Sequence, residues 1–262
     1  MTINRMEKLT IIKVGGKIVE EQASLNQLLD DFAQIPGHKM LVHGGGRSAT
    51  RIATQLGIET KMVDGRRITD SNMLNVVTMV YGGLVNKNIV ANLQARHINA
   101  LGLTGADMNV IESHKRQPNP IDFGYVGDVD RVDGQRLSQL IDSGIVPVIA
   151  PLTHNRQGEL LNTNADTIAS EVAKAMTPYY NVTLMFCFEK AGVLQDENNE
   201  STIIPHINAA DFKRLVDNGT IQGGMIPKIQ NALDAVKAEV KEVIITKATA
   251  IDGNRGTIIT NN

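Results

Sequence analysis

The sequence has no tryptophan, one cysteine and only 3% aromatic residues, and its net charge is −2. So few rings leave little surface for stacking bases, and there is no basic surplus to bind nucleic acid. We expect Cys187 to be a buried, unreactive thiol, because it lies in the apolar run VTLMFCF. No apolar run approaches the roughly 18 residues of a membrane helix. The N-terminal MTINRMEK lacks the apolar stretch of a signal peptide. These features predict a cytoplasmic protein with neither nucleic-acid nor membrane partners.

The sequence also lacks a P-loop, in which two glycines bracket four residues before Lys and Ser or Thr. The most similar stretch is LTIIKVGGK, where an apolar run containing Lys13 leads into Gly15 and Gly16. Lysine rarely lies inside a buried apolar run without a partner. Two glycines allow a backbone to approach a ligand closely. Lys13 is therefore a candidate for contact with an anion.

Short apolar runs alternate with longer helical patterns, which is typical of a parallel sheet covered by helices on both faces. The expected strands are TIIKV, KMLVH, NALGL, IVPVIA, VTLMFCF and EVIIT. DMNVIES and YVGDVDRVD predict a hairpin joined by the polar loop HKRQPNP. The length of 262 residues suits one large α/β domain or two lobes. Pro178 interrupts the pattern, so we expect lobes at 1–178 and 179–262.

A second glycine loop occurs in LVHGGGRSATRIATQLG, where a helix is expected to begin near Ser48. The amides at such a helix start can bind an anion. Gly44, Gly46 and Ala49 also fit G-x-G-x-x-A, so a nucleotide-binding dehydrogenase is an alternative. That fingerprint expects an acidic residue about 20 positions further on, and the nearest ones after Ala49, Glu59 and Asp64, come too early. We interpret His43 as a hydrogen-bonded residue at the end of a strand.

Two further segments carry charged side chains near expected helix starts. In IQGGMIPKIQNALDAV, Pro227 suits the first helical position. Lys228 then lies in the first turn, where a cation is unfavourable unless an anion binds there. In LLNTNADTIASEVAKA, Asp166 either caps the helix or holds the two lysines in place. DGRRITDSNM offers an arginine that can fork onto a carboxylate, before a helix capped by Thr69 or Asp70.

Taken in order, these motifs resemble the acetylglutamate kinases, a branch of the amino acid kinase family. The six that carry the resemblance are IIKVGGK, LVHGGGR, DGRRIT, LNTNAD, GGMIPKI and GTII. GLTGAD and GYVGDV are also similar, and the likeness runs from about Leu9 to Ile259. It implies an α/β fold of the carbamate kinase-like type, a three-layer αβα sandwich around an open, mainly parallel eight-stranded sheet. The N-terminal lobe would bind the acylglutamate and the C-terminal lobe MgATP.

The resemblance implies transfer of the γ-phosphoryl group of ATP to the γ-carboxylate of N-acetyl-L-glutamate, the second step of arginine biosynthesis. Lys13 and Lys228 would stabilise the group in transit, and Asp166 would orient both lysines. The implied acylglutamate contacts are Gly45, Gly46, Arg67 and Asn162, with Arg67 on the α-carboxylate. A carboxylate nucleophile is already ionised at neutral pH, so no general base is needed. Mg²⁺ would arrive with ATP, and no tightly bound protein metal is expected.

The implied nucleotide contacts are Gly15, Gly16, Glu189, Gly192, Leu194, Gly223 and Gly224. One of these segments departs from the family. The chain has CFEKAG where the family usually has Ser or Thr, then Asp, before a glycine. Phe188 replaces the hydroxyl residue, Glu189 replaces the Asp, and Lys190 is unusual there. The departure leaves the adenine contacts open.

About a dozen residues precede Lys13. Arginine-inhibited relatives add an N-terminal helix that links dimers into hexamers. We therefore expect a homodimer that is insensitive to arginine. The dimer contact would come from a long helical stretch, Thr69–His97, interrupted at Gly82 and Gly83.

Several functions remain open from the sequence. The acyl group is acetyl by family default, but N-succinyl-L-glutamate is an alternative substrate. Another amino acid kinase activity, on aspartate, glutamate, carbamate or a nucleotide, is a second alternative. The dehydrogenase is a third, and a non-catalytic amino-acid sensor with the same fold is a fourth.

Overall fold

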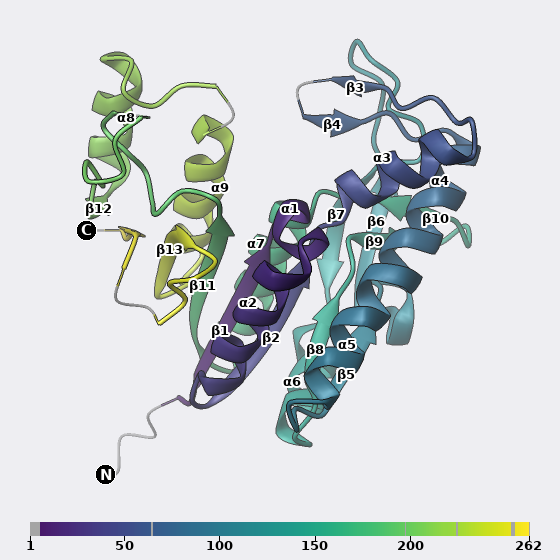
Figure 1. The fold of residues 1–262 in the computed structure, drawn as a ribbon, viewed down its shortest axis with the longest axis horizontal. Coiled ribbons are helices and arrows are strands. Elements are labelled where there is room, and N and C mark those ends of the chain that lie inside the picture. The colour runs from purple at the N-terminus through teal and green to yellow at the C-terminus, as the bar shows by residue number, and fades with distance from the viewer. Residues whose placement is uncertain (1–5, 64, 197, 224, 253–254, 262) are drawn as a thin grey trace.

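The computed structural model describes residues 6–63, 65–196, 198–223, 225–252 and 255–261 (Figure 1). An eight-stranded sheet with the order β12-β14-β13-β11-β1-β2-β8-β5 runs through the molecule. Its strands are β1 (Lys8–Val14), β2 (His38–His43), β5 (Ala100–Leu103), β8 (Val146–Ile149), β11 (Asn181–Phe188), β12 (His206–Ile207), β13 (Glu242–Lys247) and β14 (Thr257–Ile259).

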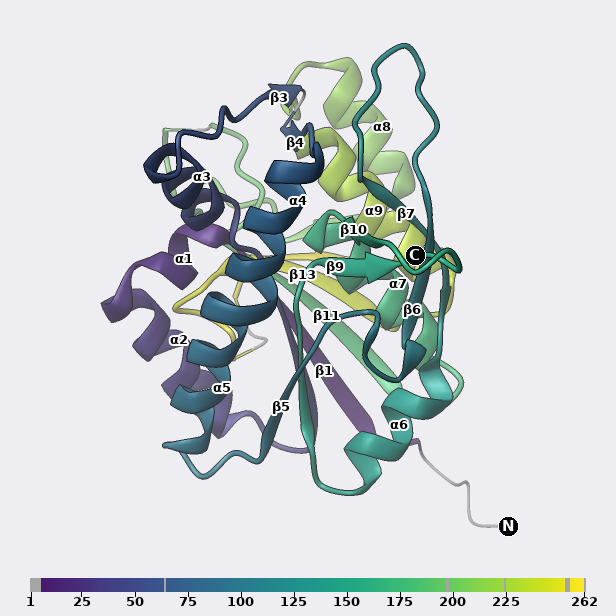
Figure 2. The ribbon, with the colours of Figure 1, turned by 90° about the vertical axis from the view of Figure 1, so that its right-hand side faces the viewer.

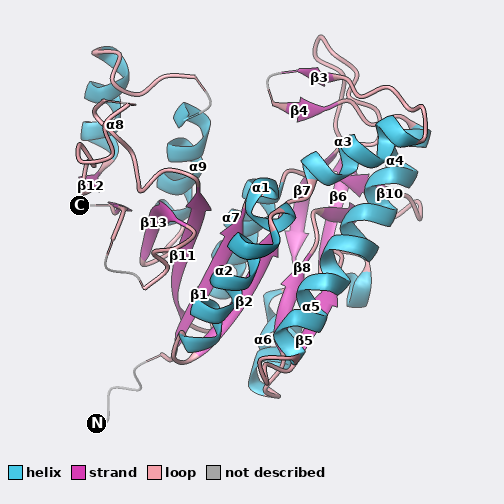
Figure 3. Cartoon of the chain, in the orientation of Figure 1, coloured by secondary structure: helices cyan, strands magenta, loops and turns pink. Residues whose placement is uncertain are grey.

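All six predicted strands lie in this sheet, and their pairings are parallel. The pairing of β13 with β14 is antiparallel, which makes the sheet mainly parallel as expected. Strand β1 occupies an interior position between β2 and β11, and six of its seven residues are buried. A strand covered on both faces is typically apolar at nearly every position, which explains why β1 is mostly apolar. Figure 3 shows these strands side by side.

Helices cover both faces of the sheet and complete the three layers of the sandwich (Figure 2). One core cluster includes Leu9, Ile11 and Phe186 and is covered by α6 (Gly134–Asp142), α7 (Ala165–Met176), α8 (Ala209–Asp217) and α9 (Met225–Lys237). The other includes Ile12, Val14 and Cys187 and is covered by α1 (Gly16–Glu20), α2 (Gln22–Gln34), α3 (Gly46–Gln55), α4 (Ser71–Val77) and α5 (Asn86–Gln94). Residues alternate between the two clusters along β1, as the two-residue period of a strand requires.

The predicted hairpin is confirmed as β6 (Ile111–Lys115) paired antiparallel with β7 (Gly127–Val132). It joins β9 (Leu152–His154) and β10 (Leu160–Asn162) in a four-stranded sheet. A two-stranded ribbon, β3 (Met62–Val63) and β4 (Arg66–Arg67), lies above α3 and α4 in Figure 1. These additions bring Arg67 and Asn162 toward the carboxyl edge of the main sheet.

The long helical stretch does not break at its two glycines, so the predicted interruption is wrong. A π-helix, Thr78–Val85, connects α4 directly to α5 and contains both Gly82 and Gly83. Asp70 caps the start of α4 by accepting a hydrogen bond from the backbone N–H of Met73. Throughout the described part of the chain, no helix is long and apolar enough to cross a membrane.

Candidate active site

Lys13 and Asp166 form an ion pair at the carboxyl edge of the sheet. The Lys13 Nζ lies 2.7 Å from Asp166 Oδ1, and the two side chains are 9% and 15% exposed. Lys13 is the sixth residue of β1, so its side chain points to the same face as Leu9 and Ile11, which α7 covers. The first turn of α7 carries Asp166. Lys13, which is unusual inside an apolar strand, therefore has Asp166 as its carboxylate partner.

Asp166 is not the cap of α7. Asn164 takes that place, and its side chain accepts hydrogen bonds from the backbone N–H groups of Asp166 and Thr167. This arrangement leaves the Asp166 carboxylate available to Lys13. Of the two interpretations of Asp166 in the sequence, the geometry therefore supports the one in which it holds a lysine.

Lys228 approaches the same place from α9. It lies in the first turn of the helix, as predicted, but the helix begins at Met225, so Pro227 is its third residue rather than its first. Burial lowers the pKa of Lys228, Asp166 opposes that shift, and Lys13 adds to it. Because all three charges influence one another, the two lysines share one electrostatic environment. Each lysine also faces the ring of Phe188, with Nζ-to-centroid distances of 5.6 Å for Lys13 and 3.9 Å for Lys228.

The two glycine loops pack backbone against backbone beside Lys13. A Cβ atom added at Gly16 would lie 3.4 Å from the Gly46 nitrogen, and one added at Gly44 would lie 3.2 Å from the Gly16 nitrogen. Helix α3 begins at Gly46, two residues before the expected start. Gly15, Gly16 and Gly46 line a cavity of about 410 Å³ together with Lys13 and Lys228. Such close loops expose amide groups that can bind an anion.

His43 and Cys187 have structural roles that match the sequence interpretation. His43 is fully buried and its Nδ1 lies 2.7 Å from the Gly44 carbonyl, while its Nε2 lies 3.1 Å from Asn86 Nδ2. Burial lowers the pKa of His43 to about 4, so the ring is neutral at pH 7. Burial also raises the pKa of Cys187 to about 12, which keeps its thiol protonated and unreactive.

The predicted acylglutamate residues line a second cavity, of about 170 Å³, which includes Gly45, Gly46, Arg67 and Asn162. Asn162 Nδ2 donates to Thr69 Oγ1 at 2.9 Å, which fixes its amide. Arg67 is buried, and its Nη2 donates to the Gly46 carbonyl at 2.7 Å and to Thr50 Oγ1 at 2.8 Å. The guanidinium is thus anchored to the glycine loop as well as facing the cavity.

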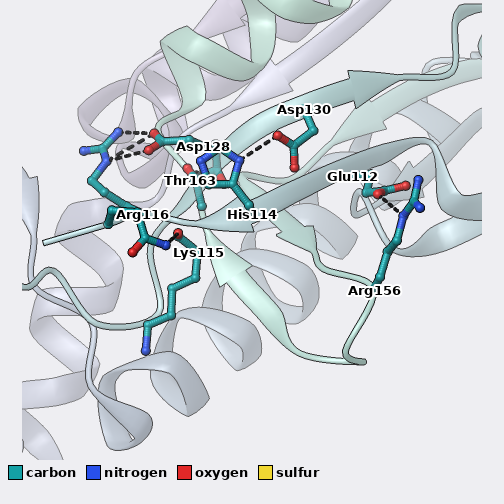
Figure 4. Close-up of polar contacts among 10 residues, drawn as sticks. Glu112, His114, Lys115, Arg116, Asp128, Asp130, Arg156 and Thr163 are labelled. Carbon is teal, nitrogen blue, oxygen red and sulfur yellow. Dashed lines mark hydrogen bonds and ion pairs between the residues drawn. The ribbon is translucent and has the colours of Figure 1, made fainter.

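Two further arginines, Arg66 and Arg116, line this cavity. Figure 4 shows the Arg116 guanidinium facing Asp128, to which it donates from Nε and Nη2. The pairing lowers the pKa of Asp128, chiefly through the hydrogen bonds from Arg116. Arg116 Nη1 is buried and has no partner among the described residues. The sequence alone predicts no site role for either arginine.

A third cavity, of about 620 Å³, lies in the C-terminal part of the chain and reaches Lys228. Of the predicted nucleotide residues, Glu189, Gly192 and Leu194 line it. Gly192 also permits close packing, because a Cβ there would lie 2.9 Å from Thr257 Oγ1. Glu189 pairs with Lys17 at 2.7 Å and with Arg47 at 3.7 Å, so its carboxylate bridges to the first and second glycine loops.

Among the described residues, one predicted nucleotide contact, Gly223, does not line any of these three cavities. Gly223 precedes α9 with a φ of 54°, a left-handed conformation that favours glycine. The prediction for Gly224 lies outside the described residues. Within the described ranges, no group of three or more His, Cys, Asp or Glu side chains is arranged to hold a metal ion.

In the sequence, Phe188 differs from its surroundings only as a departure from the family pattern. It lies at the end of β11 and lines both the 620 Å³ and the 410 Å³ cavities. The parallel pairing of β1 with β11 puts it on the same face as Lys13. That relationship depends on which strands are neighbours, which a single sequence does not reveal.

Comparison with known proteins identifies the family of this chain. The model of the amino acid kinase family matches residues 8–247. The chain is 67% identical over 253 residues to the acetylglutamate kinase of Bacteroides fragilis, covering 97% of each chain. It is 39% identical over 255 residues to that of Methanopyrus kandleri, covering 96% of this chain and 100% of the relative.

Solved structures share the fold. The protein smu.665 from Streptococcus mutans UA159 has a TM-score of 0.81 at 25% identity, covering 97% of this chain and 99% of the other. Carbamate kinase from Giardia lamblia bound to AMP-PNP has a TM-score of 0.70 at 16% identity, with coverage of 97% and 99%. Since the family model spans most of the sequence and close relatives span nearly all of it, this chain belongs to the amino acid kinase family.

Proposed function

We propose that this chain is an ATP-dependent kinase that phosphorylates the γ-carboxylate of N-acetyl-L-glutamate, the second step of arginine biosynthesis. The observation that carries the proposal is the convergence of Lys13 and Lys228 on one cavity beside Asp166. The names of relatives that are 64–67% identical over nearly the full chain support the choice of substrate.

The three cavities suggest a division of labour. ATP, as its Mg²⁺ complex, would occupy the 620 Å³ cavity with Gly192 and Leu194 on its wall. The acylglutamate would occupy the 170 Å³ cavity, with contacts to Gly45, Gly46 and Asn162 and its α-carboxylate toward Arg67. The phosphoryl group would pass through the 410 Å³ cavity between them, which Lys13 and Lys228 line. On this basis we assign the acylglutamate lobe to 1–178 and the nucleotide lobe to 179–262.

The chemistry needs charge neutralisation more than proton transfer. The nucleophile is a carboxylate, which is ionised at neutral pH, and the leaving group is ADP. In transit the phosphoryl group spreads negative charge over its equatorial oxygens. Lys13 and Lys228 would stabilise that charge, and Asp166 would hold Lys13 at its side of the path. The Mg²⁺ that arrives with ATP would neutralise further phosphate charge.

A second candidate substrate is N-succinyl-L-glutamate. It carries one more carboxylate than N-acetyl-L-glutamate, and the acylglutamate cavity has cations beyond Arg67, namely Arg66 and Arg116. Asp128 pairs with Arg116 and also interacts electrostatically with Arg66, which forms no ion pair of its own among the described residues. Two arginines beside Arg67 thus share one carboxylate. This surplus of positive charge could bind the extra carboxylate of the succinyl group, so both acylglutamates should be tested.

We also propose that the enzyme is a cytoplasmic homodimer. The helical stretch α4 to α5 leaves large apolar side chains exposed, with Met79 55% and Leu84 47% accessible. Strand β5 lies at one edge of the main sheet and exposes Leu101. Apolar groups gathered on a helix face favour burial against a second copy of the chain.

A direct test measures acyl phosphate formation by hydroxylamine trapping and ADP release by a coupled assay. N-acetyl-L-glutamate, N-succinyl-L-glutamate, L-glutamate and L-aspartate are each supplied with MgATP. We expect turnover with an N-acylglutamate and none with the free amino acids. Turnover with neither acylglutamate would refute the proposal, and the ratio of the two kcat/KM values would identify the acyl group.

A further inference from the structure

The Phe188 ring is a shared surface for the two lysines that line the 410 Å³ cavity. The Lys228 ammonium group lies 3.9 Å from the ring centroid, and that of Lys13 lies 5.6 Å away. Both distances fall inside the roughly 6 Å within which a cation is attracted to the face of an aromatic ring. The shorter contact belongs to Lys228, the lysine that α9 brings in from the C-terminal part of the chain.

The Phe188 ring is supported by a second aromatic ring on the same strand. Phe186, two residues earlier on β11, stacks against it with centroids 6.2 Å apart and an interplanar angle of 17°. Phe186 is 2% exposed and belongs to the core cluster against which Phe188 packs. A side chain supported in this way offers a fixed position to a flexible lysine, which otherwise loses conformational freedom when it is ordered.

Lys13 and Lys228 differ in their partners. Asp166 neutralises Lys13 at 2.7 Å. Among the residues that the structure describes, Lys228 makes no ion pair or hydrogen bond, and Asp166 acts on it through space. The aromatic face is therefore its direct contact. An aromatic face attracts the ammonium charge, but it does not accept hydrogen bonds from all three N–H groups. The remaining N–H groups of Lys228 can therefore donate to an incoming anion.

We propose that Phe188 is a positioning residue that holds the Lys228 ammonium group by a cation–π contact. The contact lies where the 620 Å³ cavity proposed for ATP meets the 410 Å³ cavity proposed for phosphoryl transfer. A carboxylate in place of the ring would compete with the phosphoryl group for the positive charge of Lys228, whereas the Phe188 ring carries no charge and does not compete. The inference rests on the proposed function for its effect on turnover, but the contact itself is a property of the free enzyme.

The test replaces Phe188 with Leu, which keeps an apolar side chain of similar size without the ring, and with Tyr, which keeps the ring. We expect Phe188→Leu to lower kcat by about 2- to 30-fold, the fold-change equivalent to one cation–π contact, with a smaller effect on the KM for the acylglutamate. Phe188→Tyr should stay within about twofold of the wild type. Phe212→Leu, the same change on α8, serves as the matched control and should leave kcat unchanged.

A second measurement does not depend on turnover. Because the ring stabilises the protonated amine, its loss should lower the pKa of Lys228 further. Acylation of the free enzyme across a pH series, quantified by mass spectrometry at Lys228, reports that pKa. We expect half-maximal reactivity at a lower pH in Phe188→Leu than in the wild type or Phe188→Tyr. The alkaline limb of kcat/KM should move in the same direction.

The outcomes separate the two proposals. If the wild type phosphorylates no acylglutamate while Lys228 reactivity shifts as expected, the function is wrong and the cation–π contact holds. If turnover is normal and the Lys228 profile of Phe188→Leu matches the wild type, the positioning role is wrong. Should Phe188→Leu not fold, Phe188→Met replaces it, and an unchanged Lys228 profile there overturns the inference equally.

Discussion

Lys13 on β1 and Asp166 on α7 form a 2.7 Å ion pair, although they are 153 positions apart in the sequence. Each lies near the end of its element that faces the carboxyl edge of the sheet. In open α/β sheets this edge is where ligands bind. The pair is mostly buried, so its charges act in a medium where electrostatic interactions are stronger than in water. The charges of the proposed active site and the stability of the fold are therefore coupled at this point.

Replacing Asp166 with Asn should destabilise the fold as well as the activity. It leaves the Lys13 charge buried without a counter-charge, which we expect to cost about 3 kcal/mol of unfolding free energy, measured by urea denaturation. Adding Lys13→Met should recover most of that loss, because the unpaired charge is removed. Asp30→Asn is the matched control, since Asp30 forms a 2.7 Å pair with Arg96 but is 60% exposed. That change should cost less than about 1 kcal/mol.

Removing either lysine should affect turnover far more than folding. Lys228→Ala should nearly abolish kcat, and Lys13→Ala should lower it by at least about 10²–10³-fold, the loss typical of one preorganised charge-stabilising donor. Circular dichroism should report an unchanged fold for Lys228→Ala. Lys213→Ala, on the exposed side of α8, should have wild-type kcat. Retention of a tenth of the activity by Lys228→Ala would contradict the role assigned to it.

The main sheet was predictable because its buried strands are rich in apolar residues. The runs that became β1, β2, β8, β11 and β13 are mostly apolar, with few polar residues inside them. The π-helix at Thr78–Val85 was not predictable, since glycine within an apolar stretch usually signals a break. Val80, Tyr81 and Val85 of this segment are buried in the core, and these contacts offset the low helix propensity of Gly82 and Gly83. Propensity is only a weak prior against such contacts.

The site was predictable where one residue contradicted its surroundings. Lys13 inside an apolar strand and Lys228 at a helix start are both unfavourable unless an anion is near. Phe188 and Arg116 give no such sign, because a phenylalanine in a strand and an arginine in a polar loop are ordinary. Their relevance arises from strand neighbours and from the return of the β6–β7 hairpin beside Asn162, which are tertiary relationships.

Gly45 should be intolerant of any side chain. A Cβ atom there would lie 2.7 Å from Tyr81 Cδ1, and Tyr81 is 5% exposed, so the ring has little room to move. We expect Gly45→Ala to lower the unfolding free energy by about 1–3 kcal/mol and to raise the KM for the acylglutamate. Gly46→Ala is the control for the change in stability, because its new methyl group would lie no closer than 3.7 Å to any neighbouring atom. Equal melting temperatures for the two variants would contradict the steric argument.

The apolar face of the long helix predicts the oligomeric state. Light scattering should give the mass of two chains for the wild type. A double change, Met79→Glu with Leu84→Glu, should shift it to one chain, because charges cannot be buried unpaired in such a contact. Leu56→Glu, at the end of α3, changes a residue that is 57% exposed and should leave the mass unchanged. A stable hexamer, or inhibition by arginine, would contradict the prediction of an arginine-insensitive homodimer.

His43 should make stability depend on pH in a defined window. Its pKa is about 4 in the folded chain and about 6.5 when exposed, so the unfolded state takes up a proton first as pH falls. The stabilisation is complete above about pH 6.5 and is lost as pH falls toward 4, by roughly 3 kcal/mol in total. Urea denaturation between pH 7 and pH 4 should show this slope in the wild type and a reduced slope in His43→Gln. His206→Gln, at an exposed position, should keep the wild-type slope. If His43→Gln loses stability with the same pH dependence as the wild type, the proton uptake belongs to other groups.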